Sequence, residues 1–184
     1  TIVGCNALFR DYNLEYVVCC DKHMCQEAAN TVGKNTTIYT RDKWYQSFAY
    51  WPNVKCLPNL PYEGKERADE PFHWGTGPYA GLVATMFKPK AIFMIGFDLY
   101  GLPNKGVNNV YKNTTGYEYI KSAVDPSYWI HQFNKLFEHT DCRWIVVNSK
   151  DWKMPESWAK NKNVFQESYE GLAKWCNKQL TNSK

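Results

Sequence analysis

The sequence predicts an α/β fold, a three-layer αβα sandwich with a mostly parallel, doubly wound sheet of the Rossmann-like type. Short apolar runs alternate with segments of helical pattern, as where Tyr16–Cys20 precedes Lys22–Asn30. The run Ala91–Phe97 is apolar throughout, which is typical of a strand covered on both faces. Strands and helices that alternate in this way join into a parallel sheet through right-handed crossovers.

The length and composition fit one domain and favour neither nucleic acid nor a membrane span. A chain of 184 residues can bury a sizeable core, so we expect a single α/β domain over residues 1–184. The net charge is only +4 and no long block of like charges occurs, which disfavours nucleic acid as a partner. No apolar run approaches the roughly 20 residues of a membrane span. Seven cysteines, an odd number, disfavour a disulfide framework and favour a cytoplasmic location.

The first part of the chain is expected to alternate strands with helices and to end in a long loop. Asp21 is placed to cap the first of these helices. Residues 58–73 hold three prolines and few aliphatic side chains, which predicts a loop. The predicted elements are a strand and turn over Gly4–Leu8, strands over Tyr16–Cys20, Thr36–Thr40 and Val54–Leu57, and helices over Lys22–Asn30 and Lys43–Tyr50.

The second part continues the alternation around one insertion. Thr76 is expected to cap a helix that carries Tyr79–Phe87, with Pro78 in its first turn. Residues 102–124 are rich in Asn, Gly, Lys and Tyr without periodicity, and we interpret them as a lid or insertion loop. The remaining predicted elements are strands over Ala91–Phe97, Arg143–Val147 and Val164–Gln166, a helix from Asp125 with an apolar stripe at Trp129, Ile130, Phe133, Leu136 and Phe137, and a closing helix over Tyr169–Leu180.

A glycine-containing turn follows the first predicted strand, where a doubly wound fold holds its first phosphate. Glycine lets a ligand approach the backbone, and the next helix start offers N–H donors. Gly4, Cys5 and Asn6 are therefore candidate ligand-binding residues, although a tight turn that needs glycine for packing explains the same pattern. Asp21, after the second strand, stands where such folds bind a ribose or base, or else it caps the next helix.

The stretch from Trp74 to Gly101 predicts a binding site, because a helix start leads into a buried strand that ends in an acid. Ligands of open α/β sheets bind beyond the carboxyl ends of the strands. Thr76 and Gly77 at the helix start and Tyr100 after the strand are candidate ligand-binding residues. Asp98 is a candidate general base with a partly desolvated carboxylate, or it braces a neighbouring loop.

Two further side chains are candidates because of their position beside this stretch. Arg41 follows the third predicted strand and could neutralise a phosphate, or it could form an ordinary surface salt bridge. His73 precedes the Thr76 helix start and could act as acid or base near neutral pH, or it is simply a loop histidine.

Several familiar kinds of site are not indicated by the sequence. Cys19 and Cys20 point to opposite faces of a strand, so with His23 and Cys25 they do not suit tetrahedral zinc. Neither GxGxxG nor the P-loop pattern occurs, and no GxSxG elbow is present. We therefore expect no bound metal and no resident cofactor, with a small nucleotide-like molecule as the partner.

Two motifs resemble those of the bacterial sialyltransferases. They are Gly4-Cys5-Asn6-Ala7-Leu8 and the segment from Gly75-Thr76-Gly77 to Gly96-Phe97-Asp98-Leu99-Tyr100. They also resemble the related archaeal pterin pyrophosphokinase-like proteins. The resemblance covers roughly the first hundred residues and implies a doubly wound nucleotide-binding fold. In the sialyltransferases these segments hold a cytidine nucleotide sugar. The resemblance implies as nucleotide-sugar contacts Gly4, Asn6, Thr76, Gly77 and Tyr100.

The sequence departs from the sialyltransferase pattern at two places. The family's first turn continues Gly-x-Gly-Pro-Ser-Leu, whereas here Asn6 and Ala7 replace Gly-Pro and the serine is absent. The family's catalytic histidine follows the Asp-x-Tyr strand, whereas residues 117–125 contain no histidine. Either His73 or Asp98 takes that role, or the chain binds a nucleotide without sialyl transfer.

Three functional hypotheses follow. The first is a metal-independent glycosyltransferase that uses a nucleotide sugar, with the tyrosine-rich segment 111–119 closing over it. The second is a nucleotidyl or pyrophosphoryl transferase of the pterin type, which requires magnesium held by carboxylates such as Asp21 and Asp98. The third is a noncatalytic binding module on the same fold.

Overall fold

A computed structural model describes residues 1–62, 74–100, 110–117 and 125–182. Its strands form two sheets, and the paired strands within each sheet run parallel. The structure therefore confirms the predicted α/β sandwich, and its strands are divided between two parallel sheets. The first sheet has the order β1 (Val3–Cys5), β2 (Tyr16–Val18), β3 (Thr37–Thr40), β4 (Val54–Cys56), and the second has β5 (Ala91–Ile95), β6 (Arg143–Asn148), β7 (Val164–Ser168).

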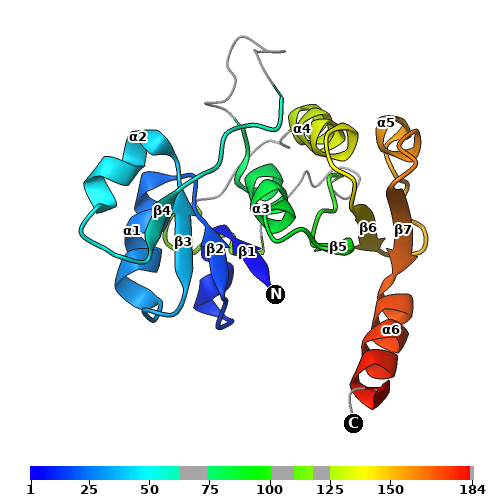
Figure 1. The fold of residues 1–184 in the computed structure, drawn as a ribbon, viewed down its shortest axis with the longest axis horizontal. Coiled ribbons are helices and arrows are strands. Elements are labelled where there is room, and N and C mark those ends of the chain that lie inside the picture. The colour runs from blue at the N-terminus through cyan, green and yellow to red at the C-terminus, as the bar shows by residue number, and fades with distance from the viewer. Residues whose placement is uncertain (63–73, 101–109, 118–124, 183–184) are drawn as a thin grey trace.

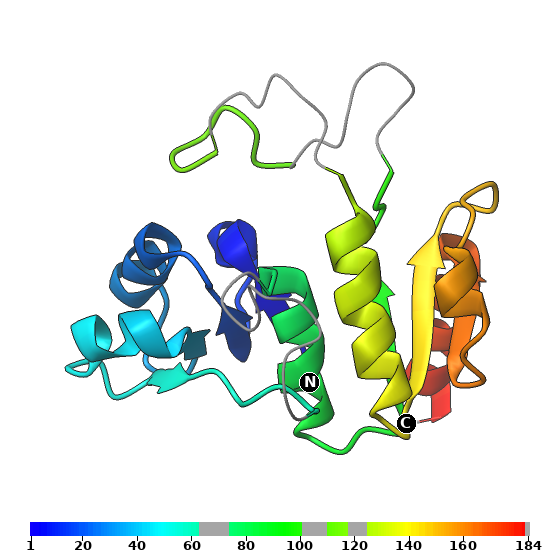
Figure 2. The ribbon, with the colours of Figure 1, turned by 90° about the horizontal axis from the view of Figure 1, so that it is seen from above.

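Helices follow most of the strands and pack on the two sheets. Figure 1 shows α3 in front of the place where β1 and β5 approach each other, and α3 and α4 lie side by side in both views (Figures 1 and 2). Among the described helices, none combines the length and the apolar character that crossing a membrane requires. The helices are α1 (Lys22–Thr31), α2 (Asp42–Tyr45), α3 (Thr76–Thr85), α4 (Ser127–Glu138), α5 (Glu156–Ala159) and α6 (Tyr169–Asn182), with the 3₁₀ turns η1 (Asn6–Arg10) and η2 (Gln46–Phe48).

The order of the strands reverses between β1 and β5. The chain builds the first sheet outward from β1 to β4, and it then builds the second sheet outward from β5 to β7 (Figure 1). Helix α3 connects the two halves because it packs on β1 and β2 and also contacts β5. In open α/β folds, such a reversal leaves a crevice at the carboxyl ends of the inner strands, where ligands bind.

The core consists of two clusters of buried side chains. The larger one surrounds α3, α4 and the inner face of the second sheet, and its Trp74, Trp144 and Trp158 are fully buried. The smaller one lies between α1 and the first sheet and includes Val17, Ile38 and residues of α1. Part of the high tryptophan content is therefore explained by the core, because these large apolar rings fill the space between helices and strands.

The outer face of the second sheet is less covered than the sequence predicts. Ile95 of β5 is 56% exposed, so the predicted cover of this strand on both faces is wrong, and the closing helix α6 leaves Leu180 67% exposed. The ring of Trp175 does pack on Phe93, with 4.7 Å between centroids. The reason is that α6 begins at Tyr169, directly after β7, and extends away from the sheet instead of folding back across it (Figure 1).

The helix starts differ in detail from the predicted caps. Asp21 occupies the N-cap position of α1, but its side chain makes no capping hydrogen bond. Thr76 is the first residue of α3 rather than its cap, and Gly75 takes the cap position. Before α4, which begins at Ser127, Pro126 takes the cap position, and the Asp125 carboxylate accepts hydrogen bonds from the Ser127 backbone N–H and hydroxyl, each at 2.9 Å.

Part of the predicted lid is described, and it lies against the first sheet's helices. Residues 110–117 form a turn in which Thr114 and Tyr117 make an antiparallel bridge. The rest of 102–124 lies outside the described residues, apart from this turn. Arg10 at the end of η1 holds the turn, since it donates to the Thr114 hydroxyl and to the Thr115 carbonyl, both at 2.8 Å.

Candidate functional site

The amino end of α3 presents backbone donors between the two sheets. The Gly75 N–H donates to the Gln132 side-chain oxygen at 2.9 Å, and Gln132 is fully buried in α4. Helix geometry leaves the N–H groups of Thr76 and Gly77 without intrahelical acceptors, and Pro78 has no N–H. The helix start therefore offers two donors and the positive end of its dipole to an anion.

Gly77 allows α3 to lie close to the segment that follows β5. A Cβ at this position would be 2.7 Å from Cε1 of Phe97, closer than real Cβ contacts come. Phe97 in turn stacks edge-on against Phe133, with 4.9 Å between ring centroids. This contact places the helix start beside the end of β5, as the sequence predicts for Thr76, Gly77 and Asp98.

Two thiols lie beside the same helix start. Burial raises the pKa of Cys20, which follows β2, to about 11, although Arg41 and a hydrogen bond with the Thr76 side chain oppose this rise. Burial, and then the nearby Cys20, raise the pKa of Cys5, at the end of β1, to about 11. Both thiols are therefore protonated near neutral pH and act as small, weakly polar side chains rather than as nucleophiles.

Arg41 connects the ends of β2 and β3 to the start of α3. Its Nε donates to the Cys20 carbonyl at 3.2 Å, and its Nη2 donates to the Trp74 carbonyl at 2.6 Å. Its guanidinium also lies over the ring of Tyr79, 5.8 Å from the centroid. Burial raises the pKa of Tyr79 to about 12, against the opposing effect of Arg41. Arg41 therefore brings a positive charge to the site on a side chain held from several directions.

The first turn shows an unusual backbone and an unsatisfied polar atom. Asn6 has φ +50°, a left-handed conformation that is uncommon outside glycine and that concentrates at functional sites. Its buried Oδ1 has no hydrogen-bond partner among the described residues. Gly4 is explained by packing, since a Cβ there would clash with a Leu14 methyl carbon.

The end of β5 is more open than the sequence predicts. Asp98 is exposed, so the expected desolvation of its carboxylate is wrong, because the chain turns outward after Gly96 at φ +81°. The Asp98 backbone carbonyl accepts a hydrogen bond from the Trp152 indole at 2.7 Å. Tyr100 is 45% exposed and faces the same indole, with 6.3 Å between ring centroids. A carboxylate and a phenol are thus available to a ligand at this edge.

The buried thiols should resist alkylation although two of them border the candidate site. With pKa values of about 11 for Cys5, Cys20 and Cys25, roughly one thiol in a thousand is ionised at pH 8. Cys176 is exposed. We expect iodoacetamide to modify Cys176 first, as read by peptide mass spectrometry, and the buried Cys20 and Cys25 only in denaturant. Equal modification of Cys20 and Cys176 in the folded protein would contradict this arrangement.

The structure brings together about half of the predicted site residues. Cys5, Arg41, Thr76 and Gly77 meet at the amino end of α3, and Asn6 follows β1 at the same edge. Asp21 is exposed at the end of β2, apart from these contacts. Asp98 and Tyr100 are connected to the group through Phe97, whereas His73 lies outside the described residues.

Sequence reasoning missed Gln132, Tyr79 and Trp152. Gln132 interrupts the apolar stripe of its helix, and a polar side chain at a core position was the signal that could have revealed it. Tyr79 and Trp152 carry no comparable signal, because aromatic residues are frequent along this chain. Their roles depend on partners far away in sequence, Arg41 and the Asp98 carbonyl.

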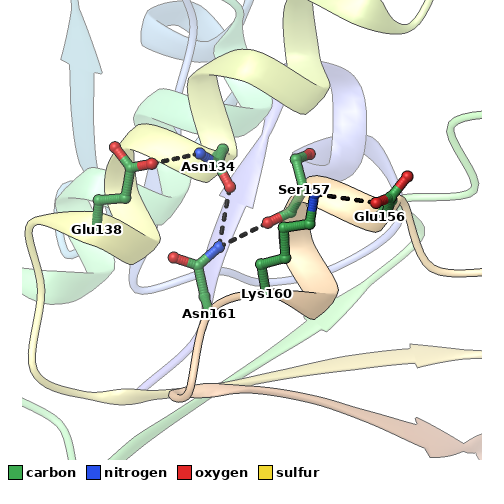
Figure 3. A pocket seen from close by; sticks show the side chains of 6 residues that line it. All are labelled: Asn134, Glu138, Glu156, Ser157, Lys160 and Asn161. Atoms are coloured by element: carbon green, nitrogen blue, oxygen red, sulfur yellow. Dashed lines mark hydrogen bonds and ion pairs between the residues drawn. The ribbon is translucent and has the colours of Figure 1, made fainter.

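Neither a metal site nor the hollow between α4 and α5 adds a candidate. Within the described ranges, no three His, Cys, Asp or Glu side chains gather in a way that could hold a metal ion. The hollow in Figure 3 is lined by side chains that bond to one another: Asn161 donates to Asn134, Asn134 to Glu138, and Lys160 pairs with Glu156. These groups are satisfied by their neighbours, so the hollow shows no polar group waiting for a ligand.

Comparison of the chain with protein-family models, with curated proteins and with solved structures found no match.

Proposed function

We propose that the protein is a nucleotide-sugar-binding glycosyltransferase of the sialyltransferase-like kind, acting without a metal ion. The observation that carries the proposal is the amino end of α3, where the Thr76 and Gly77 N–H groups lie at the reversal of strand order. The left-handed Asn6 with its unpartnered buried oxygen supports a ligand at the same edge. The resemblance of these segments to the bacterial sialyltransferases names the ligand class.

The proposed roles follow from the chemistry of each group. The α3 donors bind the phosphate, and Arg41 adds positive charge beside them. The Asn6 side-chain amide binds the nucleoside, since its oxygen accepts and its nitrogen donates hydrogen bonds. Asp98, as an exposed carboxylate, removes the proton of the acceptor hydroxyl, and Tyr100 lies beside it to orient the sugar.

Isothermal titration with cytidine, uridine, adenosine and guanosine nucleotides and their sugar conjugates tests the proposal. We expect one pyrimidine nucleotide series to bind equally well in magnesium and in EDTA, because backbone N–H groups and Arg41 neutralise the phosphate without a cation. A nucleotide that binds only in magnesium would instead favour the pterin-type transferase. No binding of any nucleotide at millimolar concentration would contradict the proposal.

Turnover separates the enzyme from a noncatalytic module. Release of free nucleotide from the bound nucleotide sugar should occur in the unaltered protein and should fall in Asp98→Asn, which keeps the size of the side chain but removes the base. Tight binding without turnover in the unaltered protein would favour the noncatalytic module.

A further inference from the structure

A groove of about 660 Å³ runs along the outer side of α1, beside the turn at residues 110–117. We infer that this groove binds a neutral, hydroxyl-rich ligand, a sugar, at a site separate from the amino end of α3. Four of the side chains that line it, His23, Gln26, Glu27 and Asn30, come from α1 itself.

The groove is formed by more than one segment of the chain, because the turn at residues 110–117 is bonded to Arg10 and Asp11 beside α1. Arg10 makes a double ion pair with Glu27, with both N···O distances at 2.6 Å, and it also holds Thr114 and Thr115 of the turn. The Tyr111 hydroxyl donates to Asp11 at 2.6 Å, which fixes the other end of the wall. The walls therefore have a defined shape before any ligand arrives, which lowers the entropic cost of binding.

One face of α1 supplies the polar floor of the groove. His23, Gln26 and Asn30 lie three and four residues apart, so they project on the same side of the helix, and all three are exposed. The Gln26 Nε2 donates to the Asn30 Oδ1 at 3.4 Å, and the other two amide atoms, an acceptor and a donor, suit the hydroxyl groups of a sugar. The turn passes close over His23 because Gly116, at φ +80°, has no Cβ, which would lie 2.7 Å from the imidazole Nε2.

Tyr111 supplies the apolar part of the groove. Its ring is half-buried against Arg10, whose guanidinium lies 5.7 Å from the ring centroid, and the ring also lines the groove. A tyrosine offers a rigid apolar surface next to polar groups, and a sugar ring has C–H groups to place against it. Amide side chains beside an aromatic ring match a ligand with both hydroxyl and C–H surfaces.

The charges of the groove disfavour a phosphate as its ligand. Among the described side chains that line it, Arg10 is the one lysine or arginine, and its charge is already paired with Glu27. Asp11 and Glu27 both lie in the wall, so the lining carries more negative than positive charge when His23 is neutral. An anionic ligand would meet repulsion here, whereas a neutral polyol would not.

Tyr117 connects this groove to the carboxyl edge of the first sheet. Its ring lies 5.8 Å from the Arg10 guanidinium. Burial raises the pKa of Tyr117 to about 12, and the nearby Cys5 and Cys19 raise it further. The turn thus contacts both regions. The binding of a sugar in this groove does not rest on the proposed glycosyl transfer.

NMR titration of the full chain with neutral methyl glycosides, namely the glucoside, galactoside, mannoside and N-acetylglucosaminide, tests the inference. We expect at least one glycoside to shift the side-chain amide signals of Gln26 and Asn30, and inorganic phosphate to leave them unchanged. The double variant Gln26→Ala with Asn30→Ala should weaken that binding by about tenfold or more. Gln46→Ala, which removes an exposed glutamine outside the groove, should leave it unchanged.

Two results would overturn the inference. One is that no glycoside shifts the Gln26 and Asn30 signals, and the other is that phosphate shifts them while the glycosides do not. The backbone amide signals of Gly75 and Gly77 report the proposed nucleotide site in the same sample. Shifts at Gln26 and Asn30 with no nucleotide response at Gly75 and Gly77 would leave the sugar groove standing and remove the proposed transfer.

Discussion

Gly77→Val is expected to weaken nucleotide binding at least tenfold, or 1.4 kcal/mol or more. The Cβ alone would lie 2.7 Å from the Phe97 ring, and valine adds two methyl groups. Phe97 is backed by Phe133, which is 1% exposed, so the ring has little room to retreat. The start of α3 must shift instead, and its N–H groups then no longer point at the phosphate of the nucleotide. Isothermal titration with the preferred nucleotide measures the loss.

Gly33→Val is the matched control for this variant. A Cβ at Gly33 has no neighbour within 4 Å, so the same change of residue should leave nucleotide affinity unaltered. Thermal unfolding of both variants separates loss of the site from loss of the fold. Full nucleotide affinity in a folded Gly77→Val protein would show that the ligand does not use the start of α3.

Arg10→Ala is expected to release the turn at residues 110–117 from α1. The substitution removes the ion pair with Glu27 and the bonds to Thr114 and Thr115, and it leaves a partly buried carboxylate without its partner. The cost should be about 2–4 kcal/mol, since each hydrogen bond to a charged group contributes about 1.5–3 kcal/mol. Hydrogen exchange of residues 110–117 should become faster, as read by mass spectrometry.

Acid should produce the same release in the unaltered protein. The Arg10 hydrogen bonds lower the pKa of Glu27 below its ordinary value of 4.5. The ion pair is therefore fully present above pH 4.5 and is lost as the pH falls through the lowered pKa. Lys160→Ala, which breaks an exposed pair with Glu156, should leave exchange in the turn unchanged. Equal exchange of the turn in Arg10→Ala and unaltered protein would mean that Arg10 does not hold it.

Local patterns predicted the fold well because residues close together in sequence determine its strands and central helices. The apolar run at Ala91–Phe97 became β5, and the stripe from Trp129 to Phe137 became the buried side of α4. Gly77 beside a strand end also followed from chain order, since neighbouring elements of a parallel sheet share an edge. These features depend on residues that are close together in sequence.

The features that the sequence could not predict depend on distant partners. Nothing near Arg10 indicates that it meets Glu27 and a turn that comes about a hundred residues later. Gln132 became recognisable as a site residue only through its bond to the Gly75 N–H. The exposure of Asp98 and of Leu180 depends on how the chain leaves β5 and β7, which apolar periodicity does not encode.

The docked turn also bears on the order in which the protein folds. The Arg10–Thr114 hydrogen bond joins residues 104 positions apart, whereas most contacts within each sheet join successive βαβ units. Closing so long a loop costs more chain entropy than pairing neighbouring strands, so distant contacts form slowly. The strands of each sheet can therefore pair first, and the turn can dock late. During synthesis, Arg10 and Glu27 are made well before the turn that they later hold against α1.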